Sequence, residues 1–492
     1  MVFNSVEFLI FFPIVLLLYF ALPKKLKWVL LLAASYFFYL SWKGDHTFID
    51  TAKLLLLIVF TTIVSYLSGI IISRTNNKAT KKLCLTVTLL VCFGVLFFYK
   101  YFNFLSGSVT SVMRFFGSET GDYKLDLILP VGISFYTFQT LSYVIDVYRG
   151  TTPVEQNFGY YALYVSFFPQ LVAGPIERPE NLLPQLKEPH RLTWVNAREG
   201  LHTLLGGFFK KVVVADLLAT YVVKVYNDLD NANGLMIVIA TVLFAFQIYC
   251  DFSGYTDIAI GCARIMGIKL MQNFDRPYIA KTIKEFWARW HISLSAWFKD
   301  YLYIPLGGNR CSKFRNCMNI LIVFLVSGLW HGAAWTYVIW GALHGIYQII
   351  GKFTYKPRNR MWEKLKVSPD GKFVSGLRRF NTFVLVCFAW IFFRANSTAD
   401  LPVIINKLFT EWSFGGEFIS KSLSAMGLDL IAIITCVLSL VILWIINKSK
   451  LELNDGSSAV NLRYAYVVWA IAIAWVLLLA GDGASSFIYF QF

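Results

Sequence analysis

Two histidines are the strongest candidates for chemistry in this chain. His331 lies in the stretch Ser327–Trp335, inside an otherwise apolar run from Met318 to Ile350. A charged side chain at the centre of a bilayer costs roughly 2–3 kcal/mol or more, so an ionisable residue at membrane depth marks a functional-site hypothesis. Histidine is also the side chain best suited to accept and return a proton near neutral pH. The sequence therefore marks His331 as the strongest functional-site candidate, suited to accept and return a proton.

The second histidine, His291, lies in residues 286–310, where aromatic side chains alternate with Arg, Lys, Asp and Ser. This composition is compatible with an interfacial amphipathic helix. The alternative is a lining for a polar ligand that enters from the cytoplasm, with 307–310 as a tight turn, and a phosphate-bearing donor would suit its basic residues. The residues that we predict to bind substrate are Arg289, Trp290, Ser295, Lys299, Asp300, Tyr303, Asn309, Arg310 and Trp330.

The other histidines carry weaker signals. His46 and His190 lie in predicted loops, and His202 begins a predicted span. His344 is expected to pack between helices, because on one continuous helix the thirteen positions after His331 would place it on a different face. HExxH, GxSxG and Walker motifs are absent from the sequence. The sequence predicts no bound metal or cofactor, and leaves a lone histidine base acting on a hydroxyl or a thioester.

Membrane-spanning helices must position these residues. Of 492 residues, 57% are hydrophobic and 15% are charged. Basic residues lie in loops between apolar runs, which accounts for the net charge of +16 without nucleic acid as a partner. We predict an all-α, polytopic membrane bundle of about nine full spans, plus a hairpin and re-entrant segments. Runs that approach or reach spanning length are Val6–Leu22, Leu54–Ile72, Leu83–Phe98, Ile237–Tyr249, Leu430–Ile446 and Tyr464–Ala480.

The chain is expected to form one membrane domain, 1–492, in four regions. These are N-terminal spans (1–149), a cytoplasmic or re-entrant segment (150–200), a catalytic core (201–366) and C-terminal spans (367–492). Lysines follow the first span, which places the N-terminus outside. The tail is expected to cross outward once more, which leaves Phe487–Phe492 outside or at the interface.

Three segments have interrupted patterns. Leu127–Tyr148 contains Pro130 and Gly132 and is predicted as an interrupted span. Tyr160–Ala173 is too short to cross, since fourteen helical residues reach only ~21 Å. Leu201–Val225 buries two lysines, Lys210 and Lys211, which we expect to snorkel or to face a wet cavity. Residues 251–316 are predicted to form the cytoplasmic face of a site.

The run that contains His331 is expected to be a hairpin. Basic residues flank it on both sides, so both ends are predicted to be cytoplasmic. Met318 to Gly351 spans 34 residues, or ~51 Å of helix, whereas two full crossings need ~60 Å. The apex should therefore lie at or inside the far boundary of the membrane core. Ser327–Ala334, which contains two glycines, is the expected apex.

Several long motifs, in order, resemble the membrane-bound O-acyltransferase family, in the branch of the alginate O-acetyltransferase membrane subunit. The match runs nearly end to end. The motifs are Leu129–Phe135, Phe168–Ile176, Asp251–Asp257, Arg289–Ser295, Asp300–Arg310, Trp330–Gly332 and the closing Phe487–Phe492. The resemblance implies a multi-span helical fold around a channel. It also implies that His331 is the family's catalytic histidine and His291 its second histidine, a position that many other branches fill with Asn or His.

The resemblance further implies transfer of an acyl group across the cell membrane, with acetyl-CoA as the donor substrate. The acceptor would be an extracytoplasmic polysaccharide, or a relay protein such as an esterase-like acyltransferase partner. His291, Asn309 or a backbone amide could stabilise the oxyanion. A related branch moves D-alanine from a carrier protein toward teichoic acid and is the main alternative. A proton-coupled transporter, with His331 as a proton relay, and a non-catalytic scaffold in an export complex are more distant alternatives.

Overall fold

Within its described residues, the chain forms helices and no strands. The computed structural model describes residues 1–42, 47–118, 121, 123–172, 174–413, 415–454, 470 and 473–475. The all-α prediction is confirmed. His46 lies outside these residues, as do most of the predicted span Tyr464–Ala480 and the closing Phe487–Phe492. The chain divides into two compact units, 1–205 with 255–271 and 206–254 with 272–492.

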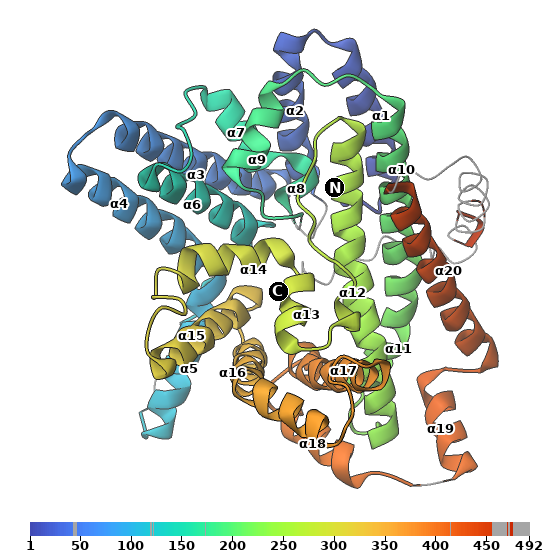
Figure 1. Cartoon of the computed structure of the whole chain (residues 1–492). Helices are drawn as coiled ribbons and strands as arrows, with labels where there is room; N and C mark the ends of the chain where they lie inside the picture. The colour runs from blue at the N-terminus through green and yellow to red at the C-terminus, as the bar shows by residue number, and fades with distance from the viewer. Residues whose placement is uncertain are drawn as a thin grey trace. The chain divides into compact units, whose positions relative to one another are not determined.

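The first unit contains a cluster of three helices, α3, α4 and α6, each of which packs against the other two (Figure 1). The glycine Gly69 on α3 permits this approach, because a Cβ there would lie 2.8 Å from the Tyr143 ring of α6. The helices of this unit are α1 (Val6–Ala21), α2 (Lys24–Leu40), α3 (Phe48–Arg74), α4 (Lys78–Leu96), the π-helix η1 (Phe97–Tyr101), α5 (Phe102–Phe115), α6 (Ile133–Arg149), α7 (Phe158–Ser166), α8 (Phe168–Leu171), α9 (Pro179–Lys187) and most of α10 (Trp194–Phe208).

Helix α6 is shorter than the sequence indicates. Residues 123–130 are not helical, and the helix begins at Ile133 after a turn. Gly132 makes this turn with a left-handed φ of 74°, a conformation that glycine adopts without steric cost. A Cβ at Gly132 would lie 2.5 Å from the Leu171 carbonyl oxygen. The predicted interrupted span is therefore an extended entry followed by one helix of 17 residues.

The short helices α7, α8 and α9 occupy the predicted re-entrant segment. Most of their side chains are buried in the first unit, although none of the three helices is long enough to cross a bilayer. Glu177, between α8 and α9, is fully buried and accepts hydrogen bonds from the Met271 backbone N–H and from Asn181 Nδ2. These contacts attach the segment to the chain that follows α12.

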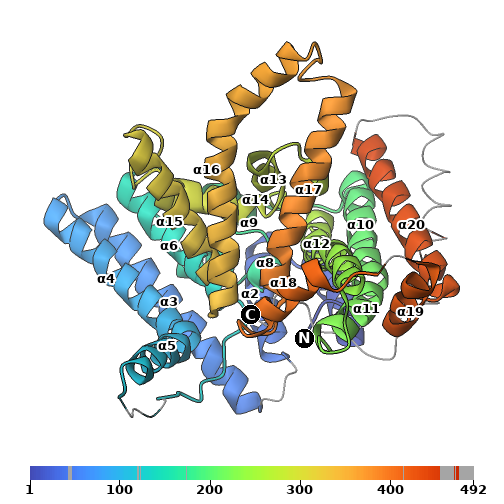
Figure 2. The ribbon, with the colours of Figure 1, turned by 90° about the horizontal axis from the view of Figure 1, so that it is seen from below.

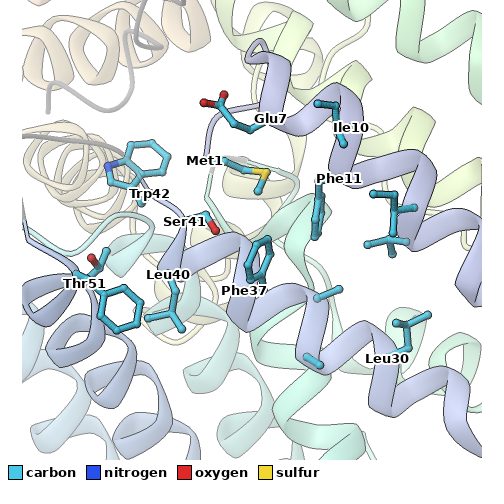
Figure 3. A pocket seen from close by; sticks show the side chains of 15 residues that line it. Met1, Glu7, Ile10, Phe11, Leu30, Phe37, Leu40, Ser41, Trp42 and Thr51 are labelled. Carbon is cyan, nitrogen blue, oxygen red and sulfur yellow. The ribbon is translucent and has the colours of Figure 1, made fainter.

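An apolar groove of about 930 Å³ lies between α1, α2 and the start of α3. Figure 3 shows Phe11 and Phe37 on facing helices within it. Its polar members, Glu7, Ser41 and Thr51, lie at the end where α2 finishes. The residues that line it include none of those predicted to bind substrate.

The second unit holds both candidate histidines. In Figure 2 its helices α16 and α17 form an antiparallel pair, and α15 packs against α16. The helices of this unit are the π-helix η2 (Phe209–Ala215), α11 (Asp216–Tyr226), α12 (Gly234–Ile265, of which 255–265 belong to the first unit), the 3-10 helix η3 (Pro277–Ile279), α13 (Ile283–Arg289), α14 (Ile292–Phe298), the π-helix η4 (Lys299–Tyr303), α15 (Lys313–His331), α16 (Trp335–Lys364), α17 (Lys372–Arg394), α18 (Asp400–Thr410), α19 (Gly416–Met426) and α20 (Leu430–Asn454).

Lys210 and Lys211, in the predicted span 201–225, lie in the π-helix η2 and not in an α-helix. Lys211 is buried in η2, and its Nζ lies 2.7 Å from Asp251 of α12 and 2.9 Å from Asp216 of α11. Lys210 lies over the ring of Tyr249, 5.6 Å from its centroid. The expectation that Lys211 would snorkel or face a wet cavity is therefore replaced by a buried ion pair.

Helix α12 continues well beyond its apolar run. The hydrophobic pattern ends at Tyr249, but the helix extends to Ile265. Asp251 is tolerated inside it because Lys211 pairs with its carboxylate. Gly254 allows η2 to approach, since a Cβ there would lie 3.1 Å from the Lys211 backbone nitrogen.

Several helices are suited to a membrane by length and composition. Five in the described part of the chain can cross a bilayer, or up to six if the bent pair Gly416–Met426 and Leu430–Ile446 forms one broken span. The five are Phe48–Arg74, Lys78–Phe115, Gly234–Ile265, Lys313–His331 and Lys372–Arg394. The chain is thus a multi-pass membrane protein, while the count of about nine spans stays a prediction.

Candidate active site

His331 is the last residue of α15, at the apex of a helical hairpin. The helix ends at Gly332, and α16 starts at Trp335 after a short turn. The predicted apex, Ser327–Ala334, is confirmed. Glycines bring the two arms together, because a Cβ at Gly328 would lie 2.3 Å from the Tyr337 carbonyl oxygen and one at Gly341 would lie 2.2 Å from that of Phe324. The side chain of His331 is 2% exposed.

His291 occupies the junction between α13 and α14. Its φ of 45° lies in the left-handed region, which non-glycine residues adopt infrequently and which recurs at functional sites. Thr282 caps α13 by accepting a hydrogen bond from the Glu285 N–H at 3.0 Å. The chain then turns sharply at His291, which caps α14 with its backbone. The side chain of His291 is fully buried.

The fold brings these two histidines together. Their ring centroids lie 6.3 Å apart. The Trp330 ring contacts both, with its centroid 5.0 Å from that of His331 and 5.9 Å from that of His291. Phe252 of α12 covers the other side of His291 at 4.7 Å. The pair is therefore enclosed by aromatic rings.

Aromatic side chains also surround His331. The centroid of Trp340 lies 5.0 Å from the His331 ring, and that of Phe393 of α17 lies 5.7 Å away. Trp290 is fully buried behind them and packs on Trp390. Such a setting excludes water from the space around the two rings. It also strengthens any hydrogen bond to a charge that develops during a reaction.

Two helical arms connect the histidine pair to a turn at residues 307–310, which includes Arg310 and is the basic turn. α14 and η4 lead away from His291 to Tyr303, and α15 leads back from Lys313 to His331. Between them, Gly307 and Gly308 adopt positive φ values of 107° and 55°. Asn316 donates from Nδ2 to the Gly308 carbonyl at 2.8 Å and to the Tyr303 hydroxyl at 2.6 Å. Fifteen residues of helix separate Asn316 from His331, a rise of about 22 Å.

This arrangement divides the predicted substrate-binding residues into two groups. Trp290 and Trp330 lie at the histidine pair, and Ser295 lies one turn into α14, where its hydroxyl faces the Trp290 carbonyl at 3.5 Å. Tyr303, Asn309 and Arg310 lie at the basic turn, near the start of α15, where Asn309 and Arg310 are exposed. Lys299 is exposed and Asp300 half-buried on the arm between the two groups.

One expectation needs revision. Asn309 lies at the opposite end of α15 from His331, so it is too distant to stabilise an oxyanion at the histidine pair. His291 lies beside the hairpin apex, where α13 and α14 bring it next to His331, and the cytoplasmic side of its pocket stays a prediction. Arg289 contacts Asp275 at 2.7 Å and Glu285 at 3.0 Å, so its role as an anion ligand stays a prediction.

His344 has the packing environment that the sequence indicates. It is fully buried on α16, and its Nδ1 accepts a hydrogen bond from the Trp287 indole at 3.2 Å. His344 and His331 lie on different helices, α16 and α15, so helical periodicity does not set their relative faces, and both rings pack on Trp340 at 5.0 Å. The described residues contain no group of three or more His, Cys, Asp or Glu side chains suited to a metal ion.

Sequence reasoning did not identify two buried polar residues of this unit. Asp251 pairs with Lys211, and its neighbour Phe252 contacts His291. Asn273 makes hydrogen bonds to the residues that follow His291. The available signal was a polar residue inside or beside an apolar segment, but each partner lies 19 or more positions away in the chain.

Comparison with known proteins identifies one family model and relatives that are named for the transfer of acyl groups to polymers. Residues 153–390 match the model of the membrane-bound O-acyltransferase family. A relative named probable alginate O-acetylase, from Azotobacter vinelandii, is 35% identical over the whole of both chains. A peptidoglycan O-acetyltransferase from Helicobacter pylori is 32% identical over all of this chain and 98% of its own. A teichoic acid D-alanyltransferase from Bacillus subtilis is 29% identical, over 54% of this chain and 69% of its own.

Proposed function

This chain belongs to the membrane-bound O-acyltransferase family, in the branch of the alginate O-acetylases, and we propose that it transfers an acetyl group across the cell membrane. The donor is a cytoplasmic thioester, acetyl-CoA. The acceptor is a hydroxyl of an extracytoplasmic polysaccharide or of an esterase-like relay protein. The observation that carries the proposal is the placement of two buried histidines, His291 and His331, at the apex of the hairpin.

His331 acts as the general base in this proposal. Its imidazole takes the proton of the acceptor hydroxyl as the oxygen attacks the thioester carbon, and it returns that proton to the departing thiolate. General base catalysis of this kind contributes roughly 10²–10⁴-fold. His291 stabilises the developing oxyanion or orients the acyl group. The aromatic rings around the pair exclude water, which would otherwise compete as the acceptor.

The basic turn forms the entrance for the donor. Arg310 is exposed beside the glycine turn, and Lys299 is exposed on the arm that leads to His291. A phosphate-bearing donor would bind these cations while its thioester extends toward the histidine pair. The length of α15 suits this mode, because the phosphates and the thioester of such a donor lie at opposite ends of an extended arm.

D-alanyl transfer is the second candidate function. It is supported by the teichoic acid D-alanyltransferase relatives, but they align with only 54% of this chain. The O-acetylating relatives align with all of it. The length of the match therefore favours acetyl as the transferred group and a polysaccharide of the cell envelope as its destination.

The test is acetylation of the envelope polymer in cells that carry either wild-type protein or His331→Ala, with protein measured in the membrane fraction. We expect acetylation to fall to background in His331→Ala while the protein level is retained. His190→Ala removes a histidine of the first unit and serves as the matched control. Full acetylation in His331→Ala would exclude the base role. Supplying labelled D-alanine in parallel separates the two donors.

A further inference from the structure

Asn273 is a buried residue that the mechanism above does not use. Its side chain is fully buried. Its main-chain carbonyl accepts a hydrogen bond from the Ile292 N–H at 2.9 Å. Its side-chain Oδ1 accepts from the Ser293 N–H at 3.2 Å and from the Ser293 hydroxyl at 2.9 Å. Asn273 is therefore attached to both residues that follow His291, and it holds the left-handed turn at that histidine.

These contacts fix the orientation of the carboxamide. A backbone N–H can only donate, so the atom that faces the Ser293 N–H must be the oxygen, and the amide cannot be flipped. The Nδ2 group, with two N–H donors, points away from Ser293. Nδ2 is buried and has no hydrogen-bond partner among the described residues. A buried donor without a partner costs roughly 1–3 kcal/mol, so native proteins retain few of them.

The surroundings of Asn273 indicate where this donor can be used. The next residue, Phe274, packs on Trp290 at 5.1 Å and on His291 at 6.4 Å between ring centroids. The carboxamide thus belongs to the same enclosed region as the histidine pair. A ligand bound there would supply the hydrogen-bond acceptor that the protein does not.

We propose that Asn273 is a catalytic residue whose Nδ2 binds the acyl carbonyl oxygen of the donor and stabilises the oxyanion, while its Oδ1 positions His291. This inference rests on the proposed function. The acceptor oxygen forms a bond to the thioester carbon, and the carbonyl electron pair moves onto the oxygen that Nδ2 faces. When the intermediate collapses, the C–S bond breaks and the thiolate takes the proton held by His331. Asn273 fills the role for which Asn309 lies too far away.

The informative variant is Asn273→Asp. It keeps the shape of the side chain and an acceptor oxygen for Ser293, but it replaces the N–H donor by oxygen. Loss of one oxyanion donor typically costs roughly 10²–10³-fold in kcat. A protonated Asp regains an O–H donor, so the residual activity of Asn273→Asp, relative to wild type, should rise as the pH falls. A purely structural role would show instead as a loss of folded protein from the membrane, which is measured at each pH.

The measurement is release of free thiol from acetyl-CoA by inside-out membrane vesicles, giving kcat and KM at several pH values. Asn77→Asp is the matched control, because Asn77 is exposed and caps α4 through an oxygen that Asp also provides. We expect Asn273→Asp to lose at least tenfold in kcat with KM within a few-fold, and Asn77→Asp to match wild type. Asn273→Asp within threefold of wild type in kcat would overturn the inference.

Failure to fold also decides the question. If Asn273→Asp and Asn273→Ser are both absent from the membrane, Asn273 is structural and the inference is overturned. If wild-type vesicles release no thiol, the assignment of acetyl-CoA in the proposed function fails. In that case Asn273→Asp and wild type are compared by polymer acetylation in cells, which supply their own donor. The same threefold limit then decides the inference.

Discussion

The rings of His291 and His331 lie 6.3 Å apart between centroids, although forty positions separate the two residues in the chain. From His291 the chain leads away through α14 and η4 to the glycine turn at Gly307 and Gly308. It then returns through α15 to His331. One continuous piece of chain therefore supplies both histidines and the basic turn. A shift in any part of it changes the geometry of the pair.

Replacing His291 by Ala should lower activity strongly without removing the protein from the membrane. His291 lies beside the base and is enclosed by Phe252 and Trp330, so its loss removes one polar group from an enclosed site. We expect a reduction of roughly 10²–10³-fold in kcat, as for loss of one oxyanion donor. Turnover at saturating donor, with the amount of folded protein measured in the same vesicles, checks this. Wild-type turnover in His291→Ala would show that the ring only packs.

The ion pair between Lys211 and Asp251 should contribute to folding and not to chemistry. Both side chains are at most 2% exposed, so Asp251→Asn leaves a buried ammonium with one carboxylate, Asp216, in place of two. Removing one partner of a buried pair typically costs roughly 3–5 kcal/mol, whereas replacing both by apolar residues of similar volume is much less costly. Thermal unfolding in detergent should therefore show a larger loss for Asp251→Asn than for the double variant Lys211→Met with Asp251→Leu.

The exposed pair Glu417 and Lys421 provides the control for this experiment. Its atoms lie 2.7 Å apart, but the side chains are 80% and 78% exposed. Such surface pairs contribute roughly 0–1 kcal/mol. Glu417→Gln should therefore leave the midpoint of unfolding nearly unchanged. Equal losses from Asp251→Asn and Glu417→Gln would contradict the structural role of the buried pair.

Glu177 should make the stability of the first unit depend on pH. Burial raises the pKa of its carboxyl from 4.5 to about 7, against the opposing effect of hydrogen bonds from Met271 and Asn181. The folded protein therefore binds this proton more tightly than the unfolded chain does. The associated stability is present below pH 4.5 and is lost as the pH rises to about 7. The loss should be on the order of 1–3 kcal/mol.

Glu177→Gln should remove this pH dependence, because glutamine stays neutral and retains an oxygen for the Met271 N–H. The midpoint of thermal unfolding, measured at pH 5 and at pH 8, should fall less in the variant than in wild type. Glu180→Gln, an exposed position on α9, serves as the control and should follow wild type. An identical fall in Glu177→Gln and wild type would show that the carboxyl does not change its protonation state between pH 5 and pH 8.

The orientation of the hairpin can be measured by labelling. Single cysteines at Lys313 and Lys356, both exposed, should resist a membrane-impermeant thiol reagent added to intact cells that carry a cysteine-depleted protein. A cysteine at the exposed Asn231 should react. The reason is charge, because basic residues flank the hairpin on both sides and acidic residues lie near Asn231. Reaction at Lys313 or Lys356 from outside would invert the assignment and place the donor on the wrong side.

The sequence predicted local features of this site better than the partners of its residues. The hairpin apex was predictable because a short apolar run, two glycines and basic flanks are all local signals. The sequence left two readings of the His291 segment open, an interfacial helix or a ligand lining, because its composition fits both and its neighbours in the fold are far away in the chain. The π-helix that buries Lys211 has no compositional signature, and its partner Asp251 lies forty positions away. Asn309 matched the expected chemistry, but the length of α15 keeps it from the pair.

The left-handed backbone at His291 also determines which substitutions there change only the side chain. With φ at 45°, a β-branched residue would pay a conformational cost of roughly 1–2 kcal/mol before its chemistry mattered, whereas Gly and Asn fit this region readily. Part of any loss of activity in His291→Ala therefore comes from backbone strain and not from loss of the imidazole. In a saturation library at this codon, the glycine member measures the loss of the ring without added backbone strain, and the asparagine member shows whether an amide donor can replace it.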